Sequence, residues 1–131
     1  GANCGVGASD LLRTVQGLAT EHPQHPLIAK GNAGIPKYHD GHIHYDGTPE
    51  LMADYACLAR DSGAKIIGGC CGTTPEHLKA MRAALEERPR SDAPSHEAIA
   101  AALGGFSSAS DGTDGNAPKA RSTKRRRRPA A

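Results

Sequence analysis

The stretch of sequence that most constrains this chain is residues 68–75, which read Gly-Gly-Cys-Cys-Gly-Thr-Thr-Pro. An apolar run over residues 64–67 leads into it, and the Thr-Pro at its end is typical of the start of a helix. The pattern predicts a strand that ends in a glycine-rich turn and is followed by a helix. In α/β folds the chemistry lies at the carboxyl ends of the strands. Glycines let the backbone bend enough for the sulfurs of Cys70 and Cys71 to face one point.

The rest of the chain also alternates between helical and strand patterns. The predicted helices cover residues 9–22, 48–62 and 74–88, and the predicted strands cover residues 26–30 and 64–68. Ser9 is expected to cap the first helix. Residues 37–47 are predicted to be a polar, solvated loop that contains His42 and His44. Strands that alternate with helices predict an α/β fold with a parallel sheet.

We interpret the four cysteines as reduced thiols, because adjacent cysteines rarely bond to each other and the chain is not dense in cysteine. Thiolates bind zinc strongly, and a catalytic zinc has three protein ligands and one open position. Cys4 is therefore the candidate for a third ligand beside Cys70 and Cys71. The alternative is that these three residues only pack as small buried side chains. Cys57 lies on the apolar face of the second predicted helix, and we interpret it as packing.

Three other features could bind a ligand. Asn3 and Asn32 lie at or after the ends of predicted strands, where either could hydrogen-bond a substrate or only shape a turn. The amino terminus of the helix that follows the cysteines favours an anion, such as a phosphate or a carboxylate. A phosphate-binding end of the fold is therefore one alternative to a catalytic zinc site. A zinc-binding module without catalysis is another.

Positive charge is concentrated near the end of the chain. Residues 119–128 carry seven Lys or Arg and no acid, whereas all other residues carry nine Lys or Arg and fourteen Asp or Glu, a net charge of −5. From residue 90 onward, apart from a short helix predicted over residues 96–103, too little apolar surface remains to offset the entropy of ordering. We therefore predict a folded domain over residues 1–89 and a flexible, disordered basic tail over residues 90–131. Without interleaved aromatic residues, no specific nucleic-acid recognition is expected.

The sequence has no run of 18 apolar residues, which is about the length that a membrane-spanning helix needs. Together with the reduced thiols, this favours a cytoplasmic protein without a membrane partner. The chain does not begin with Met, so we expect it to be a piece of a longer protein.

Four motifs resemble, in the same order, those of the homocysteine S-methyltransferases. They are residues 1–5 (Gly-Ala-Asn-Cys-Gly), 32–36 (Asn-Ala-Gly-Ile-Pro), 45–50 (Tyr-Asp-Gly-Thr-Pro-Glu) and 68–75. The resemblance covers about residues 1–88. It is strongest to bacterial betaine–homocysteine S-methyltransferases and to the homocysteine-binding part of methionine synthase. Because the family fold is a (β/α)₈ TIM barrel, the resemblance implies that this chain is the C-terminal portion of one, from about the sixth strand to the eighth helix.

The resemblance also implies an activity. The family's zinc is held by three cysteines, which fall on Cys4, Cys70 and Cys71, and no further catalytic residue is implied. The thiol of homocysteine would take the open position as a thiolate and attack a methyl group, giving methionine. Betaine is the expected methyl donor, with S-methylmethionine, a methylated folate or a corrinoid as alternatives. The chain alone is expected to be inactive, and a homo-oligomer is compatible with the resemblance, because C-terminal extensions can serve assembly in the family.

Overall fold

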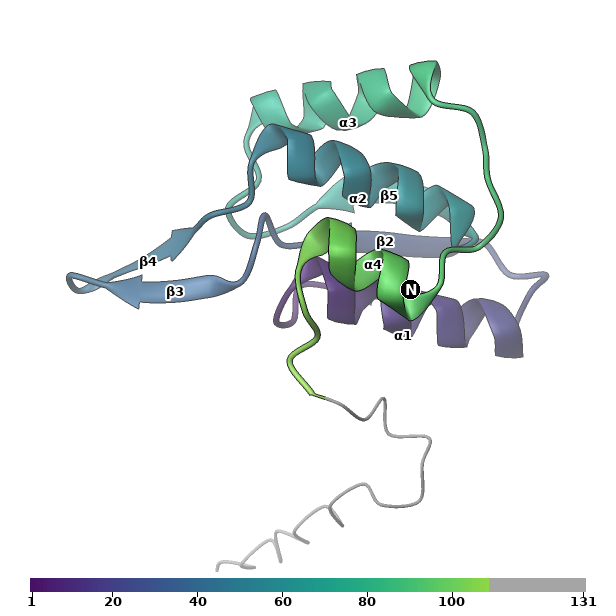
Figure 1. Cartoon of the computed structure of the whole chain (residues 1–131), viewed down its shortest axis with the longest axis horizontal. Helices are drawn as coiled ribbons and strands as arrows, with labels where there is room; N and C mark the ends of the chain where they lie inside the picture. The colour runs from purple at the N-terminus through teal and green to yellow at the C-terminus, as the bar shows by residue number, and fades with distance from the viewer. Residues whose placement is uncertain (109–131) are drawn as a thin grey trace, which may run out of the picture.

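The computed structural model describes residues 1–108, in which three short parallel strands form one sheet in the order β1-β2-β5. Figure 1 labels two of these strands, β2 and β5, together with the helices. The strands are β1 (Ala2–Asn3), β2 (Leu27–Gly31) and β5 (Ala64–Gly69), and the helices are α1 (Ala8–Glu21), α2 (Pro49–Asp61), α3 (Pro75–Glu87) and α4 (His96–Leu103). The predicted α/β class with a parallel sheet is thus confirmed. The described residues contain no helix that is both long and apolar enough to cross a membrane.

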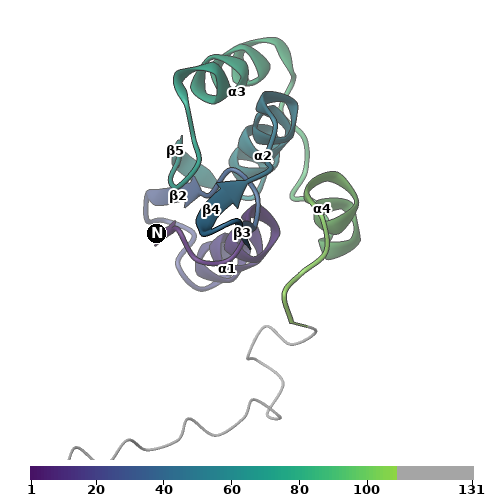
Figure 2. The same ribbon diagram turned by 90° about the vertical axis from the view of Figure 1, so that its left-hand side faces the viewer.

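In the part of the chain that the structure describes, helices cover one face of this sheet and leave the other bare. Figure 2 shows β2 and β5 at the left of the body, with α2 and α4 to their right and α1 below them. Burial alternates along β2, so that Leu27 and Ala29 are buried whereas Ile28 is 39% exposed, and Ile66 of β5 is 55% exposed. In a closed (β/α)₈ barrel the second face of each strand points into a packed interior. A sheet with one bare apolar face is therefore compatible with part of a barrel.

The core lies between the sheet and the helices, and Tyr55 of α2 is its largest fully buried side chain. The Tyr55 hydroxyl accepts a hydrogen bond from the Gly31 amide at 2.9 Å. Burial raises the pKa of this hydroxyl well above its usual range, so it stays neutral. Tyr55 thus ties α2 to the carboxyl end of β2, which is the edge of the sheet that carries the cysteine loop.

The start of α1 differs from the sequence-based expectation, whereas α2 and α3 begin at the predicted Thr-Pro pairs. Thr48 caps α2 through its side chain, as the sequence predicts. Gly7 is the N-cap of α1, so the expectation that Ser9 caps this helix is wrong. The Ser9 hydroxyl instead donates to the Gly104 carbonyl at 2.6 Å. This residue serves a long-range contact that the local pattern does not reveal.

Residues 36–45 form a β-hairpin, and the expectation of a loop here is wrong. Strands β3 (Pro36–His39) and β4 (His42–Tyr45) pair antiparallel and are joined by Asp40 and Gly41. Both turn residues have positive φ, 49° and 80°, which is the backbone that a two-residue Asp-Gly hairpin turn adopts. The hairpin projects from the end of the sheet where β2 finishes (Figure 1). His42 and His44 are exposed on it, as expected of solvated residues.

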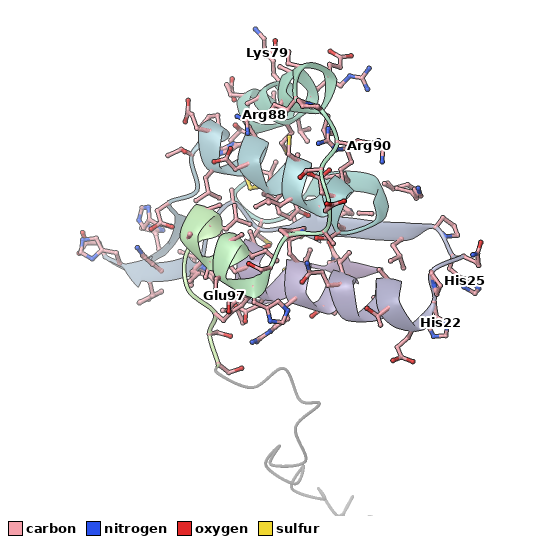
Figure 3. All side chains as sticks on the ribbon, turned by 45° about the vertical axis from the view of Figure 1, so that its right-hand side comes forward. His22, His25, Lys79, Arg88, Arg90 and Glu97 are labelled. Carbon is pink, nitrogen blue, oxygen red and sulfur yellow. The ribbon has the colours of Figure 1, made fainter. Side chains whose placement is uncertain are left out.

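Part of the region from residue 90 onward packs on the body. The buried Arg60 side chain donates to the Arg88 carbonyl at 2.8 Å and so holds the chain as it leaves α3. Figure 3 shows the segment past Arg88 and Arg90 leading to α4, on which Glu97 is labelled. Ile99 of α4 is fully buried and joins the core beside α1 and α2. Helix α4 is thus packed on the body and does not show the predicted flexibility. The reason is that Ile99 packs in the core beside α1 and α2, which lie far from it in the sequence.

The segment that follows α4 is tied to the start of α1. Asp10 accepts hydrogen bonds from the amide and the hydroxyl of Ser107, at 3.2 and 3.0 Å. The Arg13 guanidinium lies 4.5 Å from the centroid of the Phe106 ring, a cation–π contact. The remaining part of the predicted tail, residues 109–131 with their run of Lys and Arg, lies outside the described residues.

Replacing Ile99 by Ala is expected to lower the free energy of unfolding by about 2–5 kcal/mol, because the change leaves a cavity under α4. Ala102 is exposed on the same helix, and Ala102→Ser serves as the control, with an expected change within about 0.5 kcal/mol. Denaturant titration measures both. An Ile99→Ala variant as stable as the control would show that α4 is not part of the folded core.

Candidate metal centre

The cysteine pair directly follows β5. The Cys70 amide donates to the Gly31 carbonyl at 2.8 Å, so the pairing of β5 with β2 continues into the loop. Gly72 has a φ of +75°, and a Cβ at this position would lie 2.4 Å from the Cβ of Tyr45. Glycine is therefore the residue that fits this turn. The turn leaves Cys70 half-buried and Cys71 exposed.

Cys4 reaches the same place from the end of β1. Its amide donates to the Lys30 carbonyl at 2.9 Å, directly after the last pair of β1 with β2. Its φ is +64°, a left-handed conformation that residues other than glycine seldom adopt, and Gly5 follows with a φ of +82°. Strained backbone of this kind concentrates at functional sites. Here it turns the chain so that the Cys4 sulfur lies beside that of Cys71.

The three sulfurs lie close enough to share one metal ion. The Sγ atoms of Cys4 and Cys71 are 3.8 Å apart, those of Cys70 and Cys71 are 3.9 Å apart, and all three lie within 4.8 Å of one another. Tetrahedral zinc with bonds of about 2.3 Å to sulfur holds neighbouring sulfurs about 3.8 Å apart. Across residues 1–108, no other group of three His, Cys, Asp or Glu side chains meets this way. Both the donor atoms and their spacing fit zinc.

The thiols influence one another's ionisation. Hydrogen bonds from Cys71, and then from Cys70, lower the pKa of the Cys4 thiol. Burial raises the pKa of the Cys70 thiol, and its hydrogen bonds to Cys4 and Cys71 raise it further. One thiolate is therefore stabilised by its two neutral neighbours, whereas a second must form beside an existing negative charge. A cation at the centre of the three sulfurs would remove this conflict.

In the metal-free chain, iodoacetamide is expected to alkylate Cys4 at lower pH than Cys70. The pKa of Cys4 is lowered and that of Cys70 is raised, and only the thiolate reacts, so the Cys4 rate should rise first as pH increases. Peptide mass spectrometry over a pH series around neutrality measures each site. A Cys70 profile that lies at or below that of Cys4 would contradict this order.

Asn32 connects the two loops that carry the cysteines. It is buried, its side-chain amide donates to the Gly5 carbonyl at 3.1 Å, and its side-chain oxygen accepts from the Cys71 amide at 3.2 Å. Asn32 therefore holds the backbone of one loop against that of the other. The Asn3 side chain is exposed at the end of β1, one residue before Cys4. The sequence placed both asparagines at strand ends, but it gave no sign of the bracing contacts of Asn32.

Tyr45 is a neighbour of the cysteines that the sequence did not single out as a site residue. Its interaction with Cys71 is the first cause, and burial the second, of a raised pKa for its hydroxyl. It stands at the end of β4 and packs on Gly72, as the close approach of its Cβ shows. The only signal in the sequence was its place in the Tyr-Asp-Gly-Thr-Pro-Glu motif.

The other candidate residues do not join this cluster. Cys57 is buried in α2 against Ala53 and Ala84, which confirms that it packs. His42 and His44 take part in no metal-like cluster within the part of the chain that is described. At the start of α3, the Thr74 amide donates to Nδ1 of His77, so this one amide is not free for an anion.

Three thiols at the carboxyl edge of a sheet of parallel strands define an α/β fold with a candidate thiolate metal centre. The sequence pattern of the homocysteine S-methyltransferase family matches residues 1–85, and the chain therefore belongs to this family. Over 86 residues it is 31% identical to the methionine synthases of Mycobacterium leprae and Mycobacterium tuberculosis. That stretch is 65% of this chain, and the chain spans about 7% of the length of either relative.

Proposed function

We propose that this chain carries the zinc-binding end of an enzyme that transfers a methyl group to the thiol of homocysteine and so forms methionine. The observation that carries the proposal is the cluster of three sulfurs, 3.8 and 3.9 Å apart, at the carboxyl edge of a parallel sheet in a chain of this family. The names of the methionine synthase relatives agree with this reaction.

The residues that would hold zinc are Cys4, Cys70 and Cys71. When bound, zinc supplies Lewis acidity that keeps the thiol of a substrate ionised at neutral pH. The protein itself positions the sulfurs and leaves access for the substrate. Asn32 holds the loop that carries Cys4 against the loop that carries Cys70 and Cys71, and Cys71 faces solvent, so that a substrate thiol can approach. Because the thiols must stay reduced, the proposal implies a reducing compartment such as the cytoplasm.

Asn3 and Asn32 stay in the proposal as substrate-binding residues. Asn3 is exposed and directly precedes Cys4 in the sequence. Asn32 already uses both ends of its amide on backbone groups, so it would contact homocysteine only with its remaining hydrogen-bonding capacity. Betaine remains the predicted methyl donor, on the resemblance alone.

We also propose that additional βα units must join this sheet before catalysis occurs. Residues 1–131 alone would then not catalyse the methyl transfer. The support is the bare face of the sheet, where Ile28 and Ile66 are exposed although β-branched residues of this kind fill the interior of a complete barrel. Within residues 1–108, no strand pairs with the outer edge of β1 or of β5, which agrees with this proposal.

The test is formation of methionine from L-homocysteine, assayed with each candidate donor in turn. A polypeptide in which the remaining barrel strands accompany residues 1–131 should turn over with one donor, whereas residues 1–131 alone should not. Absence of methionine with betaine, S-methylmethionine, methylfolate and methylcorrinoid would contradict an enzyme. Binding of inorganic phosphate that survives Cys70→Ser and Cys71→Ser would favour the phosphate-binding alternative.

A further inference from the structure

A closed circuit of hydrogen bonds leads from the cysteine loop through the base of the β3–β4 hairpin and back to the start of α3. The Ala33 amide donates to the Cys71 carbonyl at 2.9 Å, and the Gly47 amide donates to the Ala33 carbonyl at 2.8 Å. The Gly47 carbonyl lies 2.7 Å from Nε2 of His77. The Thr74 amide donates to Nδ1 of His77 at 3.1 Å, three residues after Cys71. His77 is the only side chain that is a link in this circuit.

The partners of His77 determine how its ring is protonated. A carbonyl oxygen can only accept a hydrogen bond, so Nε2 carries the proton that is donated to Gly47. Nδ1 must then be the acceptor for the Thr74 amide, and the imidazole is neutral. His77 is only 8% exposed, so neither partner of its ring is readily replaced by water.

His77 occupies the third position of α3, where Glu or Gln usually reaches back to the amide of the capping residue. Imidazole satisfies that amide with one nitrogen and keeps a second nitrogen on the other side of the ring. This second nitrogen reaches a different loop, 30 residues away in sequence. Helix capping alone therefore does not account for a histidine at this position.

The loop at Gly47 is tightly coupled to the cysteines. A Cβ at Gly47 would lie 2.3 Å from the backbone carbon of Ala33, so the two backbones are in direct contact. Any shift of Gly47 is thus passed to Ala33 and, through its amide, to the Cys71 carbonyl. The hairpin enters and leaves the body between these points, so its base is held here against the cysteine loop.

We propose that His77 is a positioning residue of the metal centre: it locks the base of the hairpin onto the cysteine loop and thereby fixes the Cys71 sulfur relative to Cys4. The inference rests on the proposed function, in which these sulfurs hold zinc. It assigns to His77 a role through the backbone, without contact to the metal or the substrate.

Two variants separate this role from capping. His77→Asn places an amide oxygen near the position of Nδ1, which preserves the acceptor for Thr74 but reaches no further. His77→Gln places an N–H near the position of Nε2, which preserves the donor to Gly47. The zinc dissociation constant of residues 1–131, measured by competition with a chromogenic chelator, should rise about 10–100-fold in His77→Asn, as is usual when a group that orients a metal ligand is lost. His77→Gln should stay close to the unaltered chain.

A readout that needs no metal accompanies this measurement. Hydrogen exchange of the Ala33 and Gly47 amides in the metal-free chain, followed by NMR, should accelerate in His77→Asn and not in His77→Gln, at similar unfolding midpoints. A merely structural capping role predicts unchanged exchange and zinc affinity in both variants, because Asn keeps an acceptor near the position of Nδ1 and Gln is a usual capping residue at this position. Unchanged exchange and zinc affinity in His77→Asn would therefore overturn the inference. Failure of the unaltered chain to bind zinc would instead contradict the proposed function, and the exchange result would still decide the role of His77.

Discussion

Replacing Cys71 by Ser is expected to weaken zinc binding to residues 1–131 by more than about a hundredfold. Binding of structural zinc to peptides releases at least about 10 kcal/mol, and the loss of one of three thiolates should remove about a third of it. Cys71 is central among the three, because its sulfur lies 3.8 Å from that of Cys4 and 3.9 Å from that of Cys70. Competition with a chelator of known affinity measures the loss, and Cys4→Ser and Cys70→Ser should behave alike.

The fourth cysteine provides a matched control for this prediction. Cys57 is buried in α2 and packs against Ala53 and Ala84, away from the thiol cluster. Cys57→Ser removes a thiol from the same chain and should leave zinc affinity unchanged, at some cost in stability because a polar group is buried. Equal losses of affinity in Cys57→Ser and Cys71→Ser would show that the site is not the one described.

Replacing Gly47 by Ala is expected to lower the free energy of unfolding by about 3 kcal/mol or more, because the new methyl group has no room. Its Cβ would lie 2.3 Å from the Ala33 carbon and 2.6 Å from both the Ala33 oxygen and the Gly34 nitrogen. All three are backbone atoms, which cannot rotate away as a side-chain tip can. The same change should displace the loop next to the cysteines, so zinc affinity should fall with stability.

Gly17 offers the opposite control. It is exposed in the interior of α1, and a Cβ there would meet nothing within 4 Å. Gly17→Ala should therefore raise the free energy of unfolding by about 0.5–1 kcal/mol, through the better helix propensity of alanine. Thermal or denaturant unfolding of both variants gives the comparison. If Gly47→Ala proved as stable as Gly17→Ala, the close packing of Gly47 on Ala33 would be wrong.

The sequence predicted those parts of the fold that local patterns determine. The start of α2 follows from Thr48 and Pro49, because a capping hydroxyl and a proline in the first turn act within a few residues. The hairpin had a local signal too, Asp40-Gly41 between short strands, but its histidine-rich strands lack the apolar alternation that marks a buried strand.

Local sequence patterns could not predict the contacts between residues that are distant in the sequence. Ile99 is buried only because α1 and α2 offer it a surface, and nothing in residues 90–108 indicates that surface. Asn32 was identified as an asparagine after a strand, whereas His77 was not singled out in the sequence. Their roles depend on groups 27 to 39 positions away, which only the folded chain brings together. The three cysteines were identifiable because the residue type itself restricts the chemistry.

We propose that Cys4, Cys70 and Cys71 together bind one zinc ion that a homocysteine thiol can reach. X-ray absorption spectroscopy of residues 1–131 loaded with one equivalent of zinc counts the sulfur ligands directly. We expect three sulfurs at about 2.3 Å, and a fourth at a similar distance after addition of saturating L-homocysteine. Two or fewer sulfurs in the loaded chain, or a sulfur count that homocysteine leaves unchanged, would contradict this account.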